Sequence, residues 1–166
     1  MRASNRALIL AGLAGALVFA PWQPAAAQST TDDRAAAIAV ADSVLAAISR
    51  TDFKTFASFL LDDGVAMSVR SQNGLMTYRA QTKSQIAASP TNRSITERGF
   101  APTVLVSGPL AVVWYPYDLY IDGQWSHCGV DSFTMFKVEG RWRVSSLQYS
   151  VEQPPACAKH PSGPPK

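Results

Sequence analysis

Long β-rich segments separated by short turns fill the second half of the chain, and this pattern most constrains the fold. The breaks fall at Gly108-Pro109, Asp122-Gly123 and Glu139-Gly140. Two-residue breaks containing glycine, set between β-branched and aromatic runs, are typical of hairpin turns. The sequence therefore predicts a meander of four strands, over about 95–107, 110–121, 125–138 and 141–152.

The first half of the chain shows helical spacing instead. A first helix follows Thr31-Asp32-Asp33, which can cap it, and a second, short helix follows a cap at Thr51 or Asp52. The apolar residues that recur at helical spacing are Ile38, Ala41, Val44, Leu45 and Ile48 in the first, and Phe53, Phe56, Phe59 and Leu60 in the second.

A hairpin and a further helix are predicted between these helices and the meander. Strands over 65–70 and 75–79 flank Gln72-Asn73-Gly74, and Asn-Gly is a strong hairpin signal. A third helix over 82–89 ends before Pro90. Helices followed by an antiparallel meander predict an α+β domain, with N-terminal helices packed on a strongly curved, mostly antiparallel sheet. We expect this sheet to form a cone with an internal cavity.

The two ends of the chain differ from this domain in composition. Basic residues, an apolar run and an A-x-A pattern over 1–27 predict a cleaved signal peptide, and therefore a secreted or periplasmic protein without a stable membrane anchor after cleavage. The predicted domain spans 28–152. The Pro-rich segment 153–166 has no hydrophobic period, and we expect it to be mostly disordered.

The stretch HCGVDSF in the third strand of the meander contains an imidazole, a thiol and a carboxylate, and is therefore the main candidate for a functional site. Successive strand residues point to opposite faces, so His127, Gly129, Asp131 and Phe133 share one face. Two-residue turns at both hairpins place Asp118 opposite His127 and Trp114 opposite Asp131, with Gln148 and Ser146 opposite Asp131 and Phe133. This register predicts a pocket floor containing an Asp118–His127 pair.

Two other interpretations of this face stay open. A cross-strand Asp–His pair is often an ordinary polar pair at a sheet edge. A bulge at either turn would also shift the register by one residue, and each predicted partner would then point to the opposite face of the sheet.

The cysteines Cys128 and Cys157 are the only two in the chain. The predicted register places Val151 opposite Cys128, so Cys157 is six residues beyond the adjacent position, and Pro154-Pro155 can turn the segment back. For an exported protein we therefore predict an intramolecular disulfide. The alternatives are two free thiols or a bond between two chains.

The run VVWYPYDLYIDGQWSHCGVDSFTMFKVEGRWRVSSLQYSV resembles the C-terminal half of nuclear transport factor 2-like proteins of the SnoaL-like branch, and DFKTFASFLLDDGVAMSV is similar to their paired helices and first strand. The resemblance covers roughly residues 35–151. It implies a cone with a hydrophobic cavity, commonly dimerised through the sheet. Ketosteroid isomerases, polyketide cyclases, dehydratases, hydrolases and binding proteins all occur in this superfamily. The residues that match are Trp114, Tyr117, Asp118, His127, Gly129, Asp131, Phe133 and Trp142.

Three functions are compatible with these features. The first is binding of a small, largely apolar molecule by Trp114, Tyr117, Gly129, Phe133, Ser146 and Gln148. The second is acid–base catalysis of the isomerase, cyclase, dehydratase or hydrolase type, with His127, Asp118 and Asp131 as catalytic residues. The third is a protein-interaction module, with a homodimer formed through the sheet.

Several partners are not predicted from the sequence. The mature charge is close to neutral once the two arginines of the signal segment are removed, which gives no electrostatic case for nucleic acid. With two histidines, one of them in the Pro-rich segment, no metal-ligand spacing is present, and no motif indicates an organic cofactor.

Overall fold

The computed structural model describes residues 26–165. The predicted signal segment 1–27 lies outside the described residues except for Ala26 and Ala27, which begin the first helix. The elements in chain order are α1 (Ala26–Ser49), α2 (Phe53–Phe59), β1 (Leu60–Gln72), β2 (Leu75–Thr82), α3 (Lys83–Ala87), β3 (Ile95–Gly99), β4 (Thr103–Ser107), β5 (Leu110–Ile121), β6 (Gln124–Val138) and β7 (Arg141–Val151).

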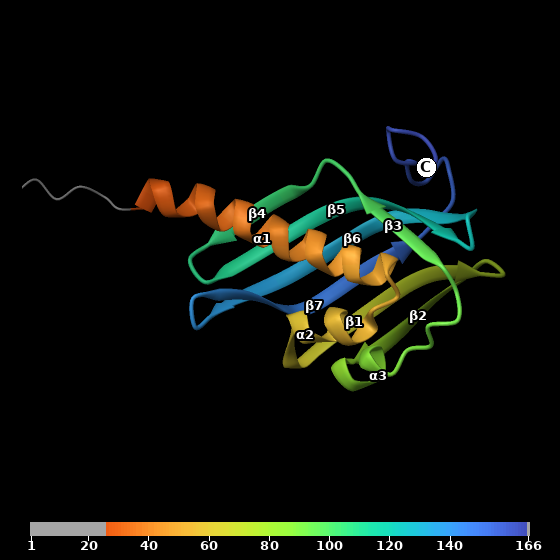
Figure 1. Cartoon of the computed structure of the whole chain (residues 1–166). Coiled ribbons are helices and arrows are strands. Elements are labelled where there is room, and N and C mark those ends of the chain that lie inside the picture. The colour runs from red at the N-terminus through yellow and green to blue at the C-terminus, as the bar shows by residue number, and fades with distance from the viewer. Residues whose placement is uncertain (1–25, 166) are drawn as a thin grey trace, which may run out of the picture.

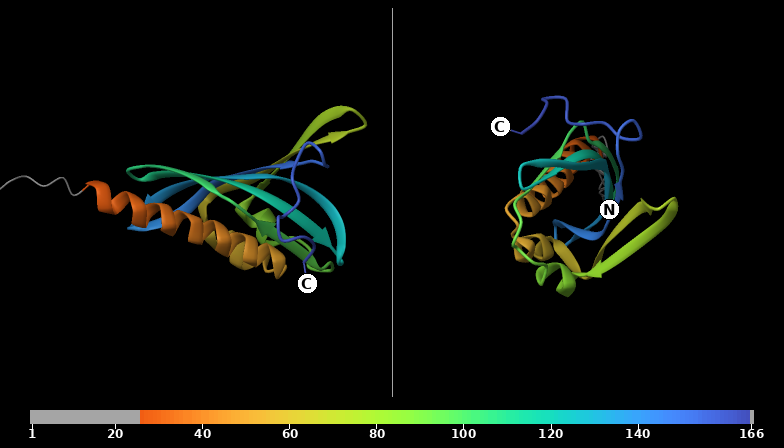
Figure 2. Two further views of the ribbon diagram at one scale, coloured as in Figure 1. Left: turned by 90° about the horizontal axis from the view of Figure 1, so that it is seen from above. Right: turned by 90° about the vertical axis from the view of Figure 1, so that its right-hand side faces the viewer.

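All seven strands form one sheet, with the order β2-β1-β7-β6-β5-β3 and with β4 also paired to β5 (Figure 1). The β1–β7 pair is parallel and the other pairs are antiparallel. Figure 2 shows that the sheet curves around the helices, which lie on its concave side, while the β1–β2 hairpin extends away from the body. The predicted α+β architecture of helices on a strongly curved sheet is confirmed.

Helix caps explain where the two short helices begin, and the cap at Asp52 is one of the two that the sequence offers for the second helix. Asp52 is the N-cap of α2, and its carboxylate accepts the Thr55 N–H at 3.0 Å. Thr82 caps α3 in a capping box with Gln85. The first helix differs from its prediction because it begins at Ala26, upstream of the Thr31-Asp32-Asp33 cap.

The predicted strand over 95–107 is two strands. The chain turns at Ala101, whose φ of 46° lies in the left-handed region. The N–H of Phe100 still donates to the Pro116 carbonyl at 2.9 Å. The break therefore separates β3 from β4, while both pair with β5.

Two β-bulges change the predicted register of the meander. Both hairpins start as expected, with Ile121 opposite Gln124 and Val138 opposite Arg141. One extra residue then follows in β6, at Ser126, and one in β7, at Ser145. Because a bulge places two residues opposite one, every later partner moves by one position.

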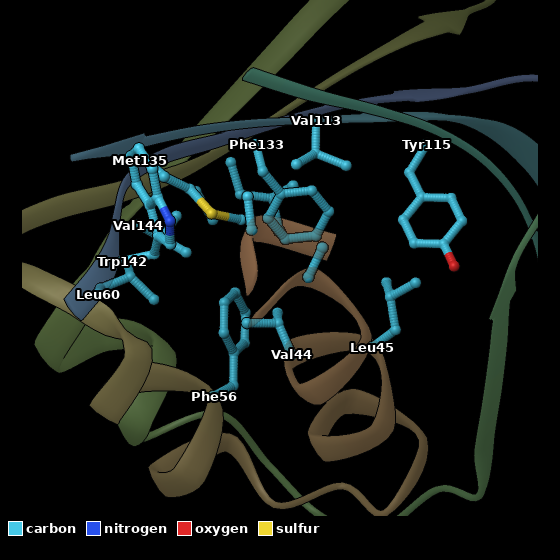
Figure 3. Packing of buried hydrophobic residues seen from close by; sticks show 14 of the residues in the cluster. Val44, Leu45, Phe56, Leu60, Val113, Tyr115, Phe133, Met135, Trp142 and Val144 are labelled. Atoms are coloured by element: carbon cyan, nitrogen blue, oxygen red, sulfur yellow. The ribbon is translucent and has the colours of Figure 1, made fainter. Parts of the chain in front are cut away.

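The hydrophobic core lies between the helices and the concave face of the sheet (Figure 3). Val44 of α1 and Phe56 of α2 pack towards Val113, Phe133 and Met135 of the sheet, and all five are buried. Among the described residues, no helix is long and apolar enough to cross a membrane.

The segment after β7 is held against the domain. The Cys128–Cys157 disulfide joins it to β6, with the two Cα atoms 5.7 Å apart. Its His160 N–H donates to Asp118, and the Lys159 ammonium lies 4.5 Å from the Trp125 ring centroid. The composition predicts a mostly disordered segment, whereas the structure places residues 153–165 in turns and bends anchored by these contacts.

Candidate functional site

A cavity of about 210 Å³ lies between the three helices and the concave face of the sheet. Its walls are mostly apolar, with Phe53 and Phe56 from α2, Ile86 from α3 and Leu119 from β5 among them. The polar residues that line it are Arg70, Gln81, Ser89, Glu97, Tyr117, His127, Asp131 and Tyr149. Apolar walls with a few polar groups are typical of sites for small molecules.

Two buried carboxyl groups are the most unusual feature of the cavity. Asp131 of β6 is 1% exposed and Glu97 of β3 is 9% exposed. The Asp131 Oδ2 atom has no hydrogen-bond partner within the described residues. Burial raises the pKa of Glu97 to about 8. Burial, together with the negative charge of Glu97, raises the pKa of Asp131 well above its usual range. Glu97 therefore favours the protonated form in the free protein at neutral pH, and Asp131 is harder to ionise than an exposed aspartate.

His127 lines the same cavity and has the opposite protonation preference. Burial, followed by the positive charge of Arg70, lowers the pKa of His127. Its Nδ1 lies 2.9 Å from the Ser126 hydroxyl, and its ring meets the Tyr117 ring edge-on with 5.8 Å between centroids. At neutral pH the imidazole is therefore neutral and able to accept a proton.

Gly129 allows the strands to approach closely beside the cavity. A Cβ added at this position would lie 2.1 Å from the Ser150 carbonyl oxygen. The Tyr117 hydroxyl donates to the same oxygen at 2.8 Å. Burial, together with Glu97 and Asp131, raises the pKa of Tyr117, so this phenol stays protonated. Phe133 lies on the same face of β6 but packs in the core.

The predicted Asp118–His127 pair is wrong. The bulge at Ser126 places Asp118 opposite Cys128 and Leu119 opposite His127, so Asp118 points to the outer face of the sheet. There it binds Arg98 through two hydrogen bonds of 2.9 and 2.6 Å. Asp118 does not line the cavity.

Three predicted ligand-binding residues also lie on the outer face. Trp114 is opposite Ser132 rather than Asp131, and its side chain is 52% exposed. Gln148 is opposite Ser132 and Ser146 is opposite Thr134, because of the bulge at Ser145. The Gln148 amide donates to the Ser146 hydroxyl at 2.8 Å. The structure therefore brings together His127, Asp131 and Tyr117 of the predicted set, with Gly129 beside them.

Sequence reasoning missed Glu97 and Tyr149 as cavity residues. Alternation in β3 places Ile95, Glu97 and Gly99 on one face and Arg98 on the other. An acid on the same face as an apolar and a small residue was the signal that could have indicated a buried Glu97. The predicted strand over 95–107 has no break, which hid this short alternation. Among the described residues, no group of three or more His, Cys, Asp or Glu side chains gathers to hold a metal ion.

No protein-family model matches the chain, and no curated protein matches it significantly. Solved structures do match. The β subunit of a proposed aromatic-ring-hydroxylating dioxygenase from Novosphingobium aromaticivorans has a TM-score of 0.64 at 13% identity, over 75% of this chain and 92% of that one. An NTF2-like protein with a cystatin-like fold from the same species has a TM-score of 0.62 at 14% identity, over 76% and 86% of the two chains.

A proposed dehydratase of the NTF2-like family from Streptomyces avermitilis has a TM-score of 0.58 at 18% identity, over 74% of this chain and 97% of that one. The sequence resemblance predicts this likeness, which holds at the level of the fold. The chain therefore has the nuclear transport factor 2-like fold.

Proposed function

We propose that this protein is exported and binds a small, largely apolar molecule in the cavity between its helices and sheet. The observation that carries the proposal is the unpartnered Oδ2 of buried Asp131 within mostly apolar walls. A buried polar atom without a partner costs free energy, and a ligand with one polar group would remove that cost. An apolar cavity of about 150 Å³ can hold benzene, so one ring with a short polar substituent suits about 210 Å³.

Filling the cavity tests this proposal. Ala66 of β1 is 5% exposed and lines the cavity, so Ala66→Phe directs a ring into it. Titration calorimetry with benzyl alcohol should show binding to the wild type and none to Ala66→Phe. Ala39→Phe, at an exposed position of α1, is the matched control and should bind like the wild type. Equal binding by a folded Ala66→Phe variant would overturn the proposal.

Export is supported by the Cys128–Cys157 disulfide, since such bonds persist in oxidising compartments. Mass spectrometry of the secreted or periplasmic protein should find Gln28 at the N-terminus. An intact Met1 on cytoplasmic protein would contradict export.

Acid–base catalysis is the second candidate function. It is favoured by the lowered pKa of His127 and the raised pKa values of Asp131 and Glu97 in one cavity. Such pairs can divide the roles of base and acid. Cyclohexanone in deuterated water is a suitable probe, because removal of an α-proton and return of a deuteron exchanges that position without another reactant. NMR should show exchange that is faster with wild type than with His127→Ala, and equal rates would exclude this role of His127.

A homodimer through the outer face of the sheet is a further proposal. Large exposed side chains, including Tyr78 at 82% and Trp114 at 52%, lie beside a shallow hollow lined by Val69 and Val130. Light scattering should give twice the mass of the chain, and Trp114→Asp should reduce it to one chain. A wild-type monomer at all concentrations would contradict the dimer and favour this face as a surface for another protein.

A further inference from the structure

We infer that the acidic end of the cavity binds the ammonium group of a small organic amine, whose apolar part occupies the rest of the cavity. This inference rests on the proposed binding function and specifies the chemical class of the ligand. It follows from the hydrogen-bonding groups and charges that surround Asp131 and Glu97.

The two carboxyl groups make no ion pair with any described residue. The five ion pairs found among these residues involve other acids, and neither carboxyl has a side-chain hydrogen bond there. Glu97 contacts the Ser49 hydroxyl only through its backbone, because its N–H donates to that oxygen at 2.8 Å and its carbonyl accepts from it at 3.0 Å. Buried acids are normally paired with a positive group or with several donors. Here the missing partner is a donor-rich, positively charged group.

Two of the polar groups that line the cavity with the acids are already engaged with other partners. The Tyr117 hydroxyl already donates to the Ser150 carbonyl, and the His127 Nδ1 lies against the Ser126 hydroxyl. The carboxyl oxygens of Asp131 and Glu97 are acceptors once either group loses its proton. An ammonium group brings three donors and no acceptor, so it matches this set better than a carbonyl or carboxylate ligand.

The charged and titratable groups that line the cavity with the two acids come from four strands. Arg70 of β1 lines the cavity at an exposed position, and His127 of β6, Tyr117 of β5 and Tyr149 of β7 also line it. The helices contribute Ile48, Phe53, Phe56 and Ile86, none of which is charged. The aromatic rings in this wall can also attract a cation through their faces. Among the described residues Arg70 makes no ion pair with Asp131 or Glu97, so neither acid is neutralised by it.

Binding of an amine should displace a proton from the carboxyl pair. In the free protein the raised pKa values of both groups favour the protonated forms. A bound ammonium stabilises one carboxylate, because an adjacent opposite charge favours ionisation. One proton then leaves to solvent as the ion pair forms, and no other co-reactant is needed.

Benzylamine and benzyl alcohol form a matched pair of probes, since they differ only in the ammonium and hydroxyl groups. Calorimetry at pH 7 with the purified protein should show benzylamine binding at least tenfold more tightly than benzyl alcohol. Titrations in buffers of different ionisation enthalpy should show release of about one proton per bound amine. Asp131→Asn and Glu97→Gln should each remove the preference, whereas Asp63→Asn, at an exposed acid, should retain it.

Each of the other outcomes of these titrations contradicts the amine inference. If benzyl alcohol binds as tightly as benzylamine, the amine inference fails while the proposed cavity function stands. If neither probe binds the wild type, both fail. A tenfold preference that persists in both Asp131→Asn and Glu97→Gln would also overturn the inference, because the cation would then bind elsewhere. The two variants together allow for one of them failing to fold.

Discussion

Asp118 and Arg98 form a bidentate ion pair on the outer face of the sheet, on adjacent strands β5 and β3. Asp118 is fully buried, and the Arg98 side chain is 19% exposed. The His160 N–H adds a third hydrogen bond to the same carboxylate at 3.1 Å. Asp118 therefore connects the sheet to the C-terminal segment, rather than contributing to the cavity.

Asp118→Asn should destabilise the fold without changing binding in the cavity. The substitution leaves the partly buried Arg98 guanidinium without its counter-charge, and loss of one partner of a buried pair typically costs about 3 kcal/mol or more. Urea unfolding should show this loss, while benzyl alcohol titration should give the wild-type affinity. Asp122→Asn is the matched control, because the Asp122–Arg93 pair is exposed on both sides and should contribute little. A loss of affinity in folded Asp118→Asn would restore a role for Asp118 in the site.

Gly129→Ala should be strongly destabilising even though it adds a single methyl group. The added Cβ would lie 2.1 Å from the Ser150 carbonyl oxygen, so β6 and β7 would have to separate. Forced overpacking of this kind costs about 1–3 kcal/mol. Unfolding measurements should also show a larger effect than Ser132→Ala, a control on the same strand. A neutral Gly129→Ala substitution would contradict the close strand approach.

The sequence allowed prediction of the architecture because helical spacing, caps and two-residue turns are local signals. The Asp52 cap and both meander hairpins begin where the sequence predicts them. The order of the strands and the parallel β1–β7 pair are not local, and only the structure gives them. Local sequence signals therefore predicted the helices and strands, whereas long-range packing determined which strands pair with one another.

The candidate site was predicted only in part, because the face of the sheet to which a side chain points was inferred by assuming an unbroken register. Serines at positions 126 and 145 give no clear bulge signal, yet each shifts the later pairs by one residue. His127 and Asp131 keep their shared face because both follow the same bulge along β6. The predicted positions of Trp114 and Gln148 depend on counting across a bulge. Both side chains were therefore assigned to the cavity face, whereas they lie on the outer face of the sheet.

Cys157→Ala should lower stability and release the C-terminal segment. The Cys128–Cys157 bond has a sequence separation of 29 residues, and closure of such a loop contributes about 3–4 kcal/mol in the chain-entropy model. Urea unfolding should show a loss of this order, and trypsin should cut the variant faster at Lys159. The oxidised wild type should show no titratable thiol under denaturing conditions and two after reduction. Two thiols before reduction would contradict the disulfide.

The buried carboxyls predict that stability falls as the pH rises from 6.5 to 8. Burial raises the pKa of Glu97 from 4.5 to about 8, so in this range the folded state holds a proton that the unfolded state has lost. The contribution of Glu97 is therefore fully present below pH 4.5 and is lost as the pH rises to about 8. Asp131 acts in the same direction.

The lowered pKa of His127 has the opposite effect, with stability lost on acidification, but only below about pH 6.5. Urea unfolding between pH 6.5 and 8 should show Glu97→Gln flattening the slope by about 1 kcal/mol per pH unit, whereas an unchanged slope would mean that Glu97 is already ionised in the folded protein.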